Sequence, residues 1–548
     1  MFAFQGPCAE TFECSLDASP YAACTSPLAL TGLPSGAHQL AVRAVFSLGK
    51  VDATPALYDW SVLPQPLPGC EPAGLSPDVE LPTRIRFVTT AGADANTGQT
   101  EALAWRTFAH AAAEAKAGDL IFVRAGLYEN DKFVLTTDGT PKAPIRVRGY
   151  QKVPFDEPSF VGLDHASALD PQAMPLLKGP NRAIDTGIQL DYRKHVEIRN
   201  VQITGYSRGI NAHGAANVAL DHIVVRDVGD VNASYSGKGI TAYASTQVRV
   251  QDSLVVNAAA EGIIVEGTCD VIRGVVVEAD DNSTGLNSAM DYYIMTNGDR
   301  NLVEDSSVRR VGNLDHVGHG IGLKGCASDT VIRHNKVRHI AGEAYYARHR
   351  GVKNNRFEWN EFDGEGVGLG FVARDGASEN VVEDSTFVNA NAGLVFMDTT
   401  EDEDENLCVS DAKVDTVVKL GGHHNQFHRL TLKGLSGAAV AYHGYNQRGA
   451  RSYANLYDDL TISNCGSVFS VAHIDHDPLG LQPANILQNS SIEGVSIYRT
   501  LAGPGGYPPV FDGNGALSSG DRDNAIVLTH VITLSKNTYK NNGFVAPL

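Results

Sequence analysis

Three stretches, TVIRHNKV (330–337), NRFEWNEF (355–362) and NVVEDSTF (380–387), repeat one eight-residue pattern at steps of 25 residues. In each of them apolar and polar positions alternate, a polar turn residue stands in the middle, and an apolar residue ends the unit. Alternation with period two is typical of β-strands, and self-similarity at a fixed step indicates a solenoid of stacked coils. The three stretches therefore predict a parallel β-helix in which each repeat belongs to one coil.

The same unit recurs along most of the chain. Eight further copies begin at Val196, Val218, Val248, Asp270, Asn301, Asn425, Asn455 and Asn485. The steps between the successive copies are 22, 30, 22, 31, 29, 25, 25, 45, 30 and 30 residues, and we interpret the longer steps as coils with inserted loops. We expect the coils to stack about 4.8 Å apart, with aliphatic side chains inside and Asn side chains in a ladder at the corners. The predicted fold class is all-β, a right-handed parallel β-helix over residues 84–548.

The region before the solenoid has a different character. Residues 1–62 show short alternating segments separated by turns, which predicts a small β-sandwich, and residues 63–83 hold six prolines and predict a linker. Residues 106–117 have helical periodicity and predict a helix that covers the open N-terminal end of the solenoid. Cys14 and Cys24 have no metal-ligand spacing, so we predict a disulfide between them and an oxidising compartment.

Residues 1–62 resemble the bacterial Ig-like modules of surface and secreted proteins. The matching residues are FECSLD (12–17), CTSP (24–27), VRA (42–44) and Trp60. This resemblance implies a spacer or an adhesive module without chemistry of its own.

Composition limits the classes of partner. The chain has 548 residues, 55 glycines and a formal net charge of −19, which argues against non-specific nucleic-acid binding. There is no apolar run of about 18–20 residues, so we expect no membrane span. We expect a secreted or cell-surface monomer, although the start Met1-Phe2-Ala3-Phe4 shows no signal peptide in this chain.

The charge distribution points to a candidate site. Residues 324–356 contain eight Lys and Arg against two acids, whereas residues 357–405 contain fourteen acids against one base. A solvated face accounts for many such runs, but a concentrated positive patch on an acidic protein favours an anionic ligand. Counting back six residues from each repeat unit places Lys324, His349 and Arg374 in one column on adjacent coils. By that count Arg348 is one residue out of phase and points to the opposite side unless a bulge intervenes.

Two segments add a family resemblance. Residues 118–149 look like the opening coil of many secreted β-helix carbohydrate enzymes, and the stretches LKGCASDTVIRHN (323–335) and ARHRGVKNNRFEWNEF (347–362) are similar to the catalytic coils of polysaccharide lyase family 6, the alginate lyases and chondroitinase B. The resemblance implies Lys324 as base, Arg348 as acid and calcium as a cofactor. The family's Arg-His-Gly reads Arg348-His349-Arg350 here, and Asp315, His316 and His319 stand where the calcium-binding acids are expected.

The predicted reaction is β-elimination on a uronic acid of an acidic polysaccharide. A group such as Arg348 or Arg374, or a metal, neutralises the substrate carboxylate, and Lys324, His349 or His319 removes the C5 proton. Further predicted substrate-binding residues are Arg350, Lys353, Tyr345 and Tyr346, and we also expect Tyr292 and Tyr293 to face outward.

Other readings stay open. A glycoside hydrolase or a C5-epimerase could use the same scaffold, with carboxylates such as Glu304 with Asp305, Asp375, or Glu383 with Asp384 in the hydrolase. A non-catalytic adhesin is a third class, which fold alone does not exclude. The motif HIDHDP (473–478) resembles a metal constellation or an epimerase cluster, and the acids Glu401–Glu405 and Asp280-Asp281-Asn282 are weaker calcium candidates.

Overall fold

The computed structural model divides the chain into two units, Met1–Gly69 and Cys70–Leu548. The structure describes residues 11–17, 19–26, 28, 30, 36–46, 50–52, 54–62, 67, 70, 81–156, 168–182, 185–230, 237–280, 290–312, 318–397, 421–443, 452–472, 484–501 and 532–543.

The first unit contains an antiparallel four-stranded sheet. Its strands are β1 (Thr11–Leu16), β2 (Ala22–Cys24), β3 (Gly36–Val45) and β4 (Ala56–Val62), in the order β2-β1-β3-β4. A disulfide joins Cys14 on β1 to Cys24 on β2, which confirms the predicted pairing. The Ig-like identity of this unit stays a prediction.

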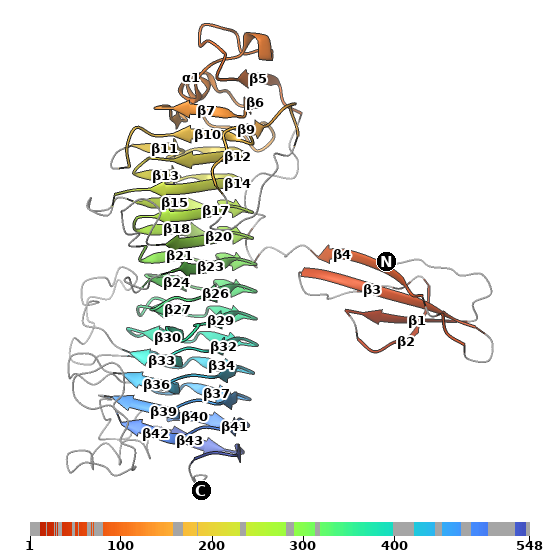
Figure 1. Ribbon diagram of the computed structural model, residues 1–548, viewed down its shortest axis with the longest axis vertical. Helices are drawn as coiled ribbons and strands as arrows, with labels where there is room; N and C mark the ends of the chain where they lie inside the picture. The colour runs from red at the N-terminus through yellow and green to blue at the C-terminus, as the bar shows by residue number, and fades with distance from the viewer. Residues whose placement is uncertain are drawn as a thin grey trace. The chain divides into compact units, whose positions relative to one another are not determined.

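The second unit is the predicted right-handed parallel β-helix. Across the described ranges, forty strands form one continuous parallel ladder, and Figure 1 shows them stacked from β5 to β44. They form three walls, each built from one strand per coil. Wall 1 consists of β8 (Phe133–Val134), β11 (Thr186–Gln189), β13 (Arg208–Asn211), β15 (Lys238–Thr246), β18 (Glu261–Thr268), β21 (Tyr292–Thr296), β24 (His319–Leu323), β27 (Glu343–Arg348), β30 (Leu369–Arg374), β33 (Ala392–Met397), β36 (Ala438–His443), β39 (Ser467–Ala472) and β42 (Ile497–Leu501).

The other two walls follow wall 1 around each coil. Wall 2 consists of β5 (Arg84–Val88), β6 (Asp119–Arg124), β9 (Ile145–Tyr150), β12 (Lys194–Thr204), β14 (Ala216–Val228), β16 (Arg249–Gln251), β19 (Val271–Arg273), β22 (Leu302–Glu304), β25 (Val331–Arg333), β28 (Arg356–Glu358), β31 (Val381–Glu383), β34 (Gln426–His428), β37 (Leu456–Asp458), β40 (Asn485–Gln488) and β43 (Ile532–Ser535). Wall 3 consists of the second halves of β12 and β14 together with β7 (Gly126–Glu129), β10 (Pro175–Lys178), β17 (Leu254–Ala258), β20 (Val276–Asp280), β23 (Ser307–Val311), β26 (Lys336–Arg338), β29 (Glu361–Asp363), β32 (Thr386–Val388), β35 (Thr431–Lys433), β38 (Thr461–Ser463), β41 (Ser491–Glu493) and β44 (Thr538–Lys540).

The strand register follows the sequence repeat. Ile332 pairs with Phe357, and Phe357 pairs with Val382, as the step of 25 residues requires. Val382 then pairs with Phe427 across the 45-residue step, so the insertion leaves the register of the coils intact. All of these side chains are buried and belong to one core that runs along the solenoid.

Corner residues make the turn in the middle of the unit. His334, Trp359 and Asp384 occupy this position on successive coils with φ of 54°, 50° and 51°. This left-handed conformation turns the chain from wall 2 into wall 3, and Asn and Asp adopt it more readily than most residues.

The predicted Asn ladder is present at the corner between walls 1 and 2. Asn355 Nδ2 donates to Asn380 Oδ1 at 2.9 Å, and the ladder continues through Asn425 and Asn455 to Asn485. These side chains are buried away from water, so the ladder supplies the hydrogen bonds that their amide groups need.

A short helix lies beside the first coils. Helix α1 (Phe108–Glu114) falls within 106–117, with Thr107 as its N-cap, and the 3-10 turn η2 (Glu101–Leu103) precedes it. Phe108 packs edge-on against Tyr128 at a centroid distance of 5.0 Å. The carboxylate of Asp131 accepts hydrogen bonds from the first two backbone amides of the helix, which fixes its N-terminus on the coil below.

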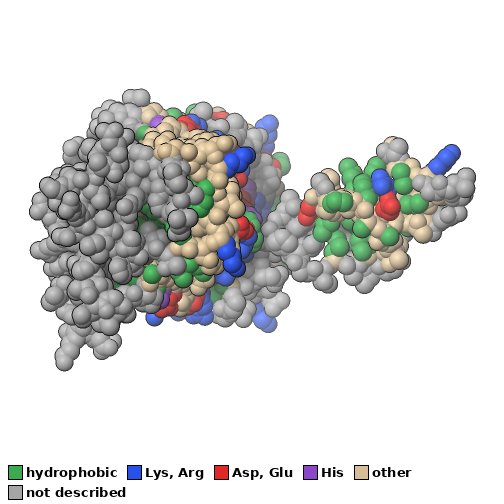
Figure 2. Space-filling view, turned by 90° about the horizontal axis from the view of Figure 1, so that it is seen from below, with side chains coloured by type: hydrophobic (Ala, Val, Ile, Leu, Met, Phe, Trp, Pro, Cys, Tyr) green, Lys and Arg blue, Asp and Glu red, His purple; other side chains and the backbone are tan. Residues whose placement is uncertain are grey.

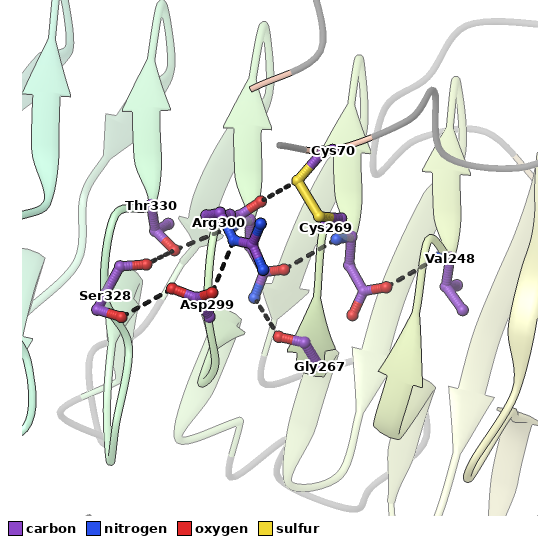
Figure 3. The surroundings of a disulfide bond; sticks show 10 residues. Cys70, Val248, Gly267, Cys269, Asp299, Arg300, Ser328 and Thr330 are labelled. Carbon is purple, nitrogen blue, oxygen red and sulfur yellow. Dashed lines mark hydrogen bonds and ion pairs between the residues drawn. A yellow bond between two sulfur atoms is a disulfide. The ribbon is translucent and has the colours of Figure 1, made fainter. Parts of the chain in front are cut away.

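A second disulfide attaches Cys70, within the Pro-rich segment, to the solenoid. Cys70 is bonded to Cys269, which directly follows β18 (Figure 3). Cys326 is disulfide-bonded as well, while Cys465 is a buried free thiol whose pKa burial raises to about 11. The sequence left the state of the four later cysteines undecided. At least two of them, Cys269 and Cys326, form disulfides.

One ladder position predicts a pH-dependent stability. Asp270 occupies the Asn position on its coil: its backbone amide donates to Asn301, its carboxyl accepts from the Val248 amide at 2.8 Å, and Ser245 Oγ lies at 2.6 Å. Burial raises the pKa of Asp270 to about 7, so the folded state binds a proton more tightly than the unfolded chain. Proton binding to Asp270 stabilises the folded state. This stabilisation is fully present below the ordinary pKa of 3.8 and is lost as the pH rises through 7.

Asp270→Asn should therefore stabilise the protein by about 2–4 kcal/mol at pH 8 and by nothing measurable at pH 4. Urea unfolding at both values is the measurement, with Asp459→Asn at an exposed corner as the control. A gain that is equal at both pH values would contradict a protonated Asp270.

Candidate active site

The basic sequence window does not form one patch. Arg333, Lys336 and Arg356 lie on walls 2 and 3, where each is paired with an acid. Arg333 lies 2.8 Å from Glu304, Lys336 lies 3.6 Å from Glu361, and Arg356 bonds to an acid on its own strand. In the space-filling view basic and acidic side chains likewise lie side by side (Figure 2). The expectation of one concentrated positive patch is therefore wrong, because neighbours in sequence point to different walls.

The basic residues that do come together lie at the end of the wall 1 strands. Leu323 pairs with Ala347, and Arg348 pairs with Arg374, so Lys324, Arg348 and Arg374 follow one another on adjacent coils. The count from the repeat units had placed His349 in this column instead, and that prediction is wrong. The turn from Arg348 to its wall 2 corner contains one residue more than the next turn, and His349 opens it with φ of 90°.

Tyr292 on β21 is the centre of the resulting cluster. Its hydroxyl oxygen lies 3.4 Å from Lys324 Nζ and 3.4 Å from Arg348 Nη1. Lys324 Nζ also lies 5.1 Å from the centre of the tyrosine ring, and the ring of His319 stacks against it at 5.1 Å. Burial, together with Asp291, raises the pKa of Tyr292 to about 12, against the opposing effect of Arg348. The hydroxyl is therefore protonated at neutral pH.

A buried chain of ion pairs supports this cluster from behind. His319 Nδ1 lies 3.1 Å from Glu343, and the other carboxylate oxygen of Glu343 lies 2.9 Å from Arg374. Arg374 continues to Asp375 at 2.8 Å, and Asp375 lies 3.4 Å from Arg348. Because Arg348 and His319 both contact Tyr292, the ion pairs close a ring around that side chain.

The neighbours of Glu343 favour its ionised form. Burial alone would raise the pKa of Glu343, but the hydrogen bond and charge of His319 and the charge of Arg374 outweigh burial and lower it to about 2. Glu343 and Asp375 in turn raise the pKa of Arg374 above its ordinary value. Arg374, predicted as a substrate-binding residue, is as buried as Arg348, but it is engaged by two carboxylates, Glu343 at 2.9 Å and Asp375 at 2.8 Å. We interpret it as a residue that positions the cluster.

The predicted tyrosines separate into two groups. Tyr345 faces the core, where its hydroxyl donates to the backbone oxygen atoms of Asn335 and Glu361, so the prediction of an outward side chain is wrong. Tyr293 also belongs to the core. Tyr346 lies on the outward face as expected, 6.0 Å from Tyr292, but it is fully buried among aliphatic side chains. Of the four tyrosines, Tyr292 alone is both outward and partly exposed.

The remaining predicted residues lie in the turn after β27. His349 is 5% exposed, and its Nδ1 accepts a hydrogen bond from the Gly325 amide at 2.9 Å. This contact connects the turn to the coil of Lys324. Arg350 lies against the turn of the following coil, beside Gly376. Burial, the charge of His424 and then the charge of Arg350 lower the pKa of His423 to about 4. Lys353 is exposed at the next corner.

Sequence reasoning missed the carboxylates that accompany the cluster. Glu266 on β18 forms a side-chain hydrogen bond with Asn297, which follows β21. The positive charge of Lys324 also acts on the Glu266 carboxylate. Burial, and then Glu261, raise the pKa of Glu266 above its ordinary value. No sequence motif marks Glu343 or Glu266, because the residue that pairs with each of them on the neighbouring coil is not an acid: Leu369 pairs with Glu343, and Tyr243 pairs with Glu266.

The carboxylates proposed for a hydrolase lie elsewhere, except for Asp375. Glu304 and Asp305 are on wall 2 and its corner, and Glu304 is paired with Arg273 and Arg333. Glu383 and Asp384 hold the same positions three coils further on, where Arg429 pairs with both. None of these four belongs to the ring around Tyr292.

Calcium, which the family resemblance implies, does not fit the described carboxylates of the cluster. Glu343 and Asp375 each contact a guanidinium at 2.8–2.9 Å, and these cations occupy the oxygen atoms that a calcium cage would use. Elsewhere among the described residues, Asp221, His222 and Asp252 bring three ligand atoms together, but Asp221 is paired with Arg199 at 2.6 Å.

Some candidates lie outside the described residues. These are Asp315, His316, Asp281, Asn282, the motif at 473–478 and the acids Glu401–Glu405.

Comparison with protein-family models and with curated proteins gives no match. Solved structures that resemble the chain include the GH136 lacto-N-biosidase from Eubacterium ramulus, with 14% identity, coverage of 76% of this chain and 68% of that chain, and a TM-score of 0.42. An alginate lyase from Paenibacillus sp. str. FPU-7 has 13% identity, coverage of 83% and 99%, and a TM-score of 0.33. A rhamnogalacturonan lyase has 13% identity, coverage of 57% and 82%, and a TM-score of 0.41.

None of the helices in the described ranges has the length and apolar composition needed to span a bilayer.

Proposed function

We propose that this protein is a secreted polysaccharide lyase that cleaves an acidic, uronic-acid-containing polysaccharide by β-elimination. The observation that carries the proposal is the position of the Tyr292 hydroxyl, 3.4 Å from both Lys324 Nζ and Arg348 Nη1. A base, a carboxylate-binding cation and a proton donor are the groups that β-elimination on a uronate requires, and three such groups converge here. The disulfides, among them Cys14–Cys24 and Cys70–Cys269, support an oxidising, extracellular location.

The roles follow from the chemistry of each group. Arg348 pairs with the substrate carboxylate, which makes the C5 proton more acidic and stabilises the negative charge that develops when it leaves. Lys324 Nζ takes that proton. The C4–O4 bond then breaks, and the protonated hydroxyl of Tyr292 supplies the proton to the departing oxygen. The products are a chain with a new reducing end, which keeps O4, and a chain whose new non-reducing end is a uronate with a C4=C5 double bond.

The ring of ion pairs holds these groups in place. Asp375 lies against Arg348, and Glu343 holds both His319 and Arg374, so the cluster is arranged before substrate arrives. Preorganised charges of this kind need no reorganisation during the reaction.

The proposal is tested by incubating the full chain with alginate, polygalacturonate, chondroitin sulfate and hyaluronan. We expect the ultraviolet absorbance of the unsaturated uronate to rise with at least one of them. Tyr292→Phe should lower the rate with that substrate by about 10²-fold or more, because it removes only the proton donor. If all four polymers are left intact, or if Tyr292→Phe is as fast as the wild type, the assigned chemistry is wrong.

A glycoside hydrolase is the second candidate, and one observation favours it. Glu266 has a raised pKa and lies near Glu261, and retaining or inverting glycosidases use two carboxyl groups of unequal pKa. New reducing ends without absorbance of a double bond, together with their loss in Glu266→Gln, would establish this reading instead. A C5-epimerase would show neither product.

A further inference from the structure

An exposed tryptophan stands on the edge of the solenoid away from the candidate active site. Trp359 is 44% exposed and lies at the corner between β28 and β29, where walls 2 and 3 meet. The candidate site lies on wall 1, which forms the remaining side of the coil. We call the four successive corner residues His334, Trp359, Asp384 and Arg429 the corner ridge.

Backbone preference does not explain a tryptophan at this position. Trp359 has φ of 50°, a left-handed conformation that is a genuine outlier for a bulky side chain and that suits Asn or Asp. Asp384 and Asp459 fill the same position on other coils with φ of 51° and 58°. Burial does not compensate for this strain, because nearly half of the side chain is in contact with solvent. Strain that is retained without a packing gain indicates function.

The surroundings hold the indole as a rigid platform. The ring of His334 on the preceding coil stacks on it at a centroid distance of 5.1 Å and an interplanar angle of 6°. On the other side, Arg429 pairs with Asp384 at 2.7 Å, so the next corner residue along the ridge is fixed as well. The side chains of Arg356 and Arg429 are about half exposed, and both pair with Glu383.

We propose that the corner ridge is a non-catalytic binding platform for a polysaccharide, in which the apolar face of a sugar ring packs against the indole of Trp359. A flat aromatic surface flanked by charged hydrogen-bonding groups is suited to a pyranose, which has an apolar face and a polar rim. The class of polysaccharide, an acidic one, rests on the proposed function. A polymer held on this ridge would raise the local concentration of substrate for the site on wall 1.

The test measures retention of the full chain on immobilised alginate, polygalacturonate, chondroitin sulfate and hyaluronan. Trp359→Asn is the decisive variant, because Asn suits the left-handed backbone and should leave the melting temperature unchanged or raised. We expect at least a fivefold loss of retention on the polymer that binds the wild type. Tyr192→Asn is the matched control, since Tyr192 is also an exposed aromatic residue, 60% accessible, with φ of 60°.

The outcomes are distinct. Unchanged retention of Trp359→Asn, an equal loss in Tyr192→Asn, or no retention of the wild type on any of the polymers overturns the platform. A lowered melting temperature with normal retention shows that Trp359 has only a structural role and overturns it too. Retention that depends on Trp359 without any cleavage would leave the platform intact and contradict only the lyase.

Discussion

Lys324→Ala should lower the rate of β-elimination by about 10²–10⁴-fold, because it removes the group that takes the C5 proton. The fold should tolerate the change, since Lys324 lies on the outward face and is partly exposed. The initial rate of double-bond formation on the best polymer gives the size of the effect, and circular dichroism with a thermal melt shows whether the β-helix is intact.

Lys336→Ala is the matched control for that variant. Lys336 is an exposed lysine of the next wall 3 strand, paired with Glu361 at 3.6 Å, and it should be dispensable for catalysis. A folded Lys324→Ala protein that keeps most of the wild-type rate would remove the base from the proposed mechanism.

Glu343→Gln should lower the free energy of unfolding by about 3–5 kcal/mol, the usual cost of breaking a buried ion pair by removing one partner. Glu343 is fully enclosed and holds Arg374 at 2.9 Å and His319 at 3.1 Å, so the variant leaves a guanidinium without one of its carboxylates. Urea unfolding measures the loss. The catalytic rate should fall as well, because His319 and Arg374 would no longer fix the surroundings of Tyr292.

The same carboxylate predicts the acid limit of stability. The pKa of Glu343 in the folded protein, about 2, is below its ordinary value of 4.5. Its contribution is therefore complete above 4.5 and is lost as the pH falls from 4.5 toward 2. In Glu343→Gln this part of the acid sensitivity should disappear.

Glu361→Gln supplies the comparison for Glu343. Its carboxylate is 59% exposed and paired at the surface, so the change should cost less than about 1 kcal/mol. Similar losses in the two variants would mean that the buried ring is not specially stabilising.

The fold was predictable because one unit is repeated many times. Apolar positions such as Ile332, Phe357 and Val382 recur at the spacing of one coil, and each of them pairs with the next in the structure. The Asn ladder was visible for the same reason, because Asn recurs at the corner between walls 1 and 2 on successive coils. Inserted loops did not disturb this inference, because the register resumes after each of them.

The site was harder to predict, since turns between wall 1 and wall 2 differ in length. Counting from the repeat units crosses those turns, and the extra residue after Arg348 shifted His349 into the wrong position. A better signal was available within wall 1, where a small residue stands second in each strand: Gly320, Ala344 and Gly370. Counting four residues on from each of these gives Lys324, Arg348 and Arg374, which is the order that the structure shows.

The acids of the site could not be derived from sequence spacing at all. Glu343 begins a strand whose neighbours begin with His319 and Leu369, so no repeated residue type marks the position. Its importance comes from burial beside Arg374, which is a property of the folded coil.

The central claim is that the cluster around Tyr292 breaks the glycosidic link by elimination, without adding water. Cleavage of the best acidic polymer in water enriched in the heavy oxygen isotope, followed by mass spectrometry of the products, tests it most directly. We predict unsaturated ends that carry none of the label, and no such products from Lys324→Ala. Saturated products with one labelled oxygen at each new reducing end would contradict the lyase and identify a hydrolase.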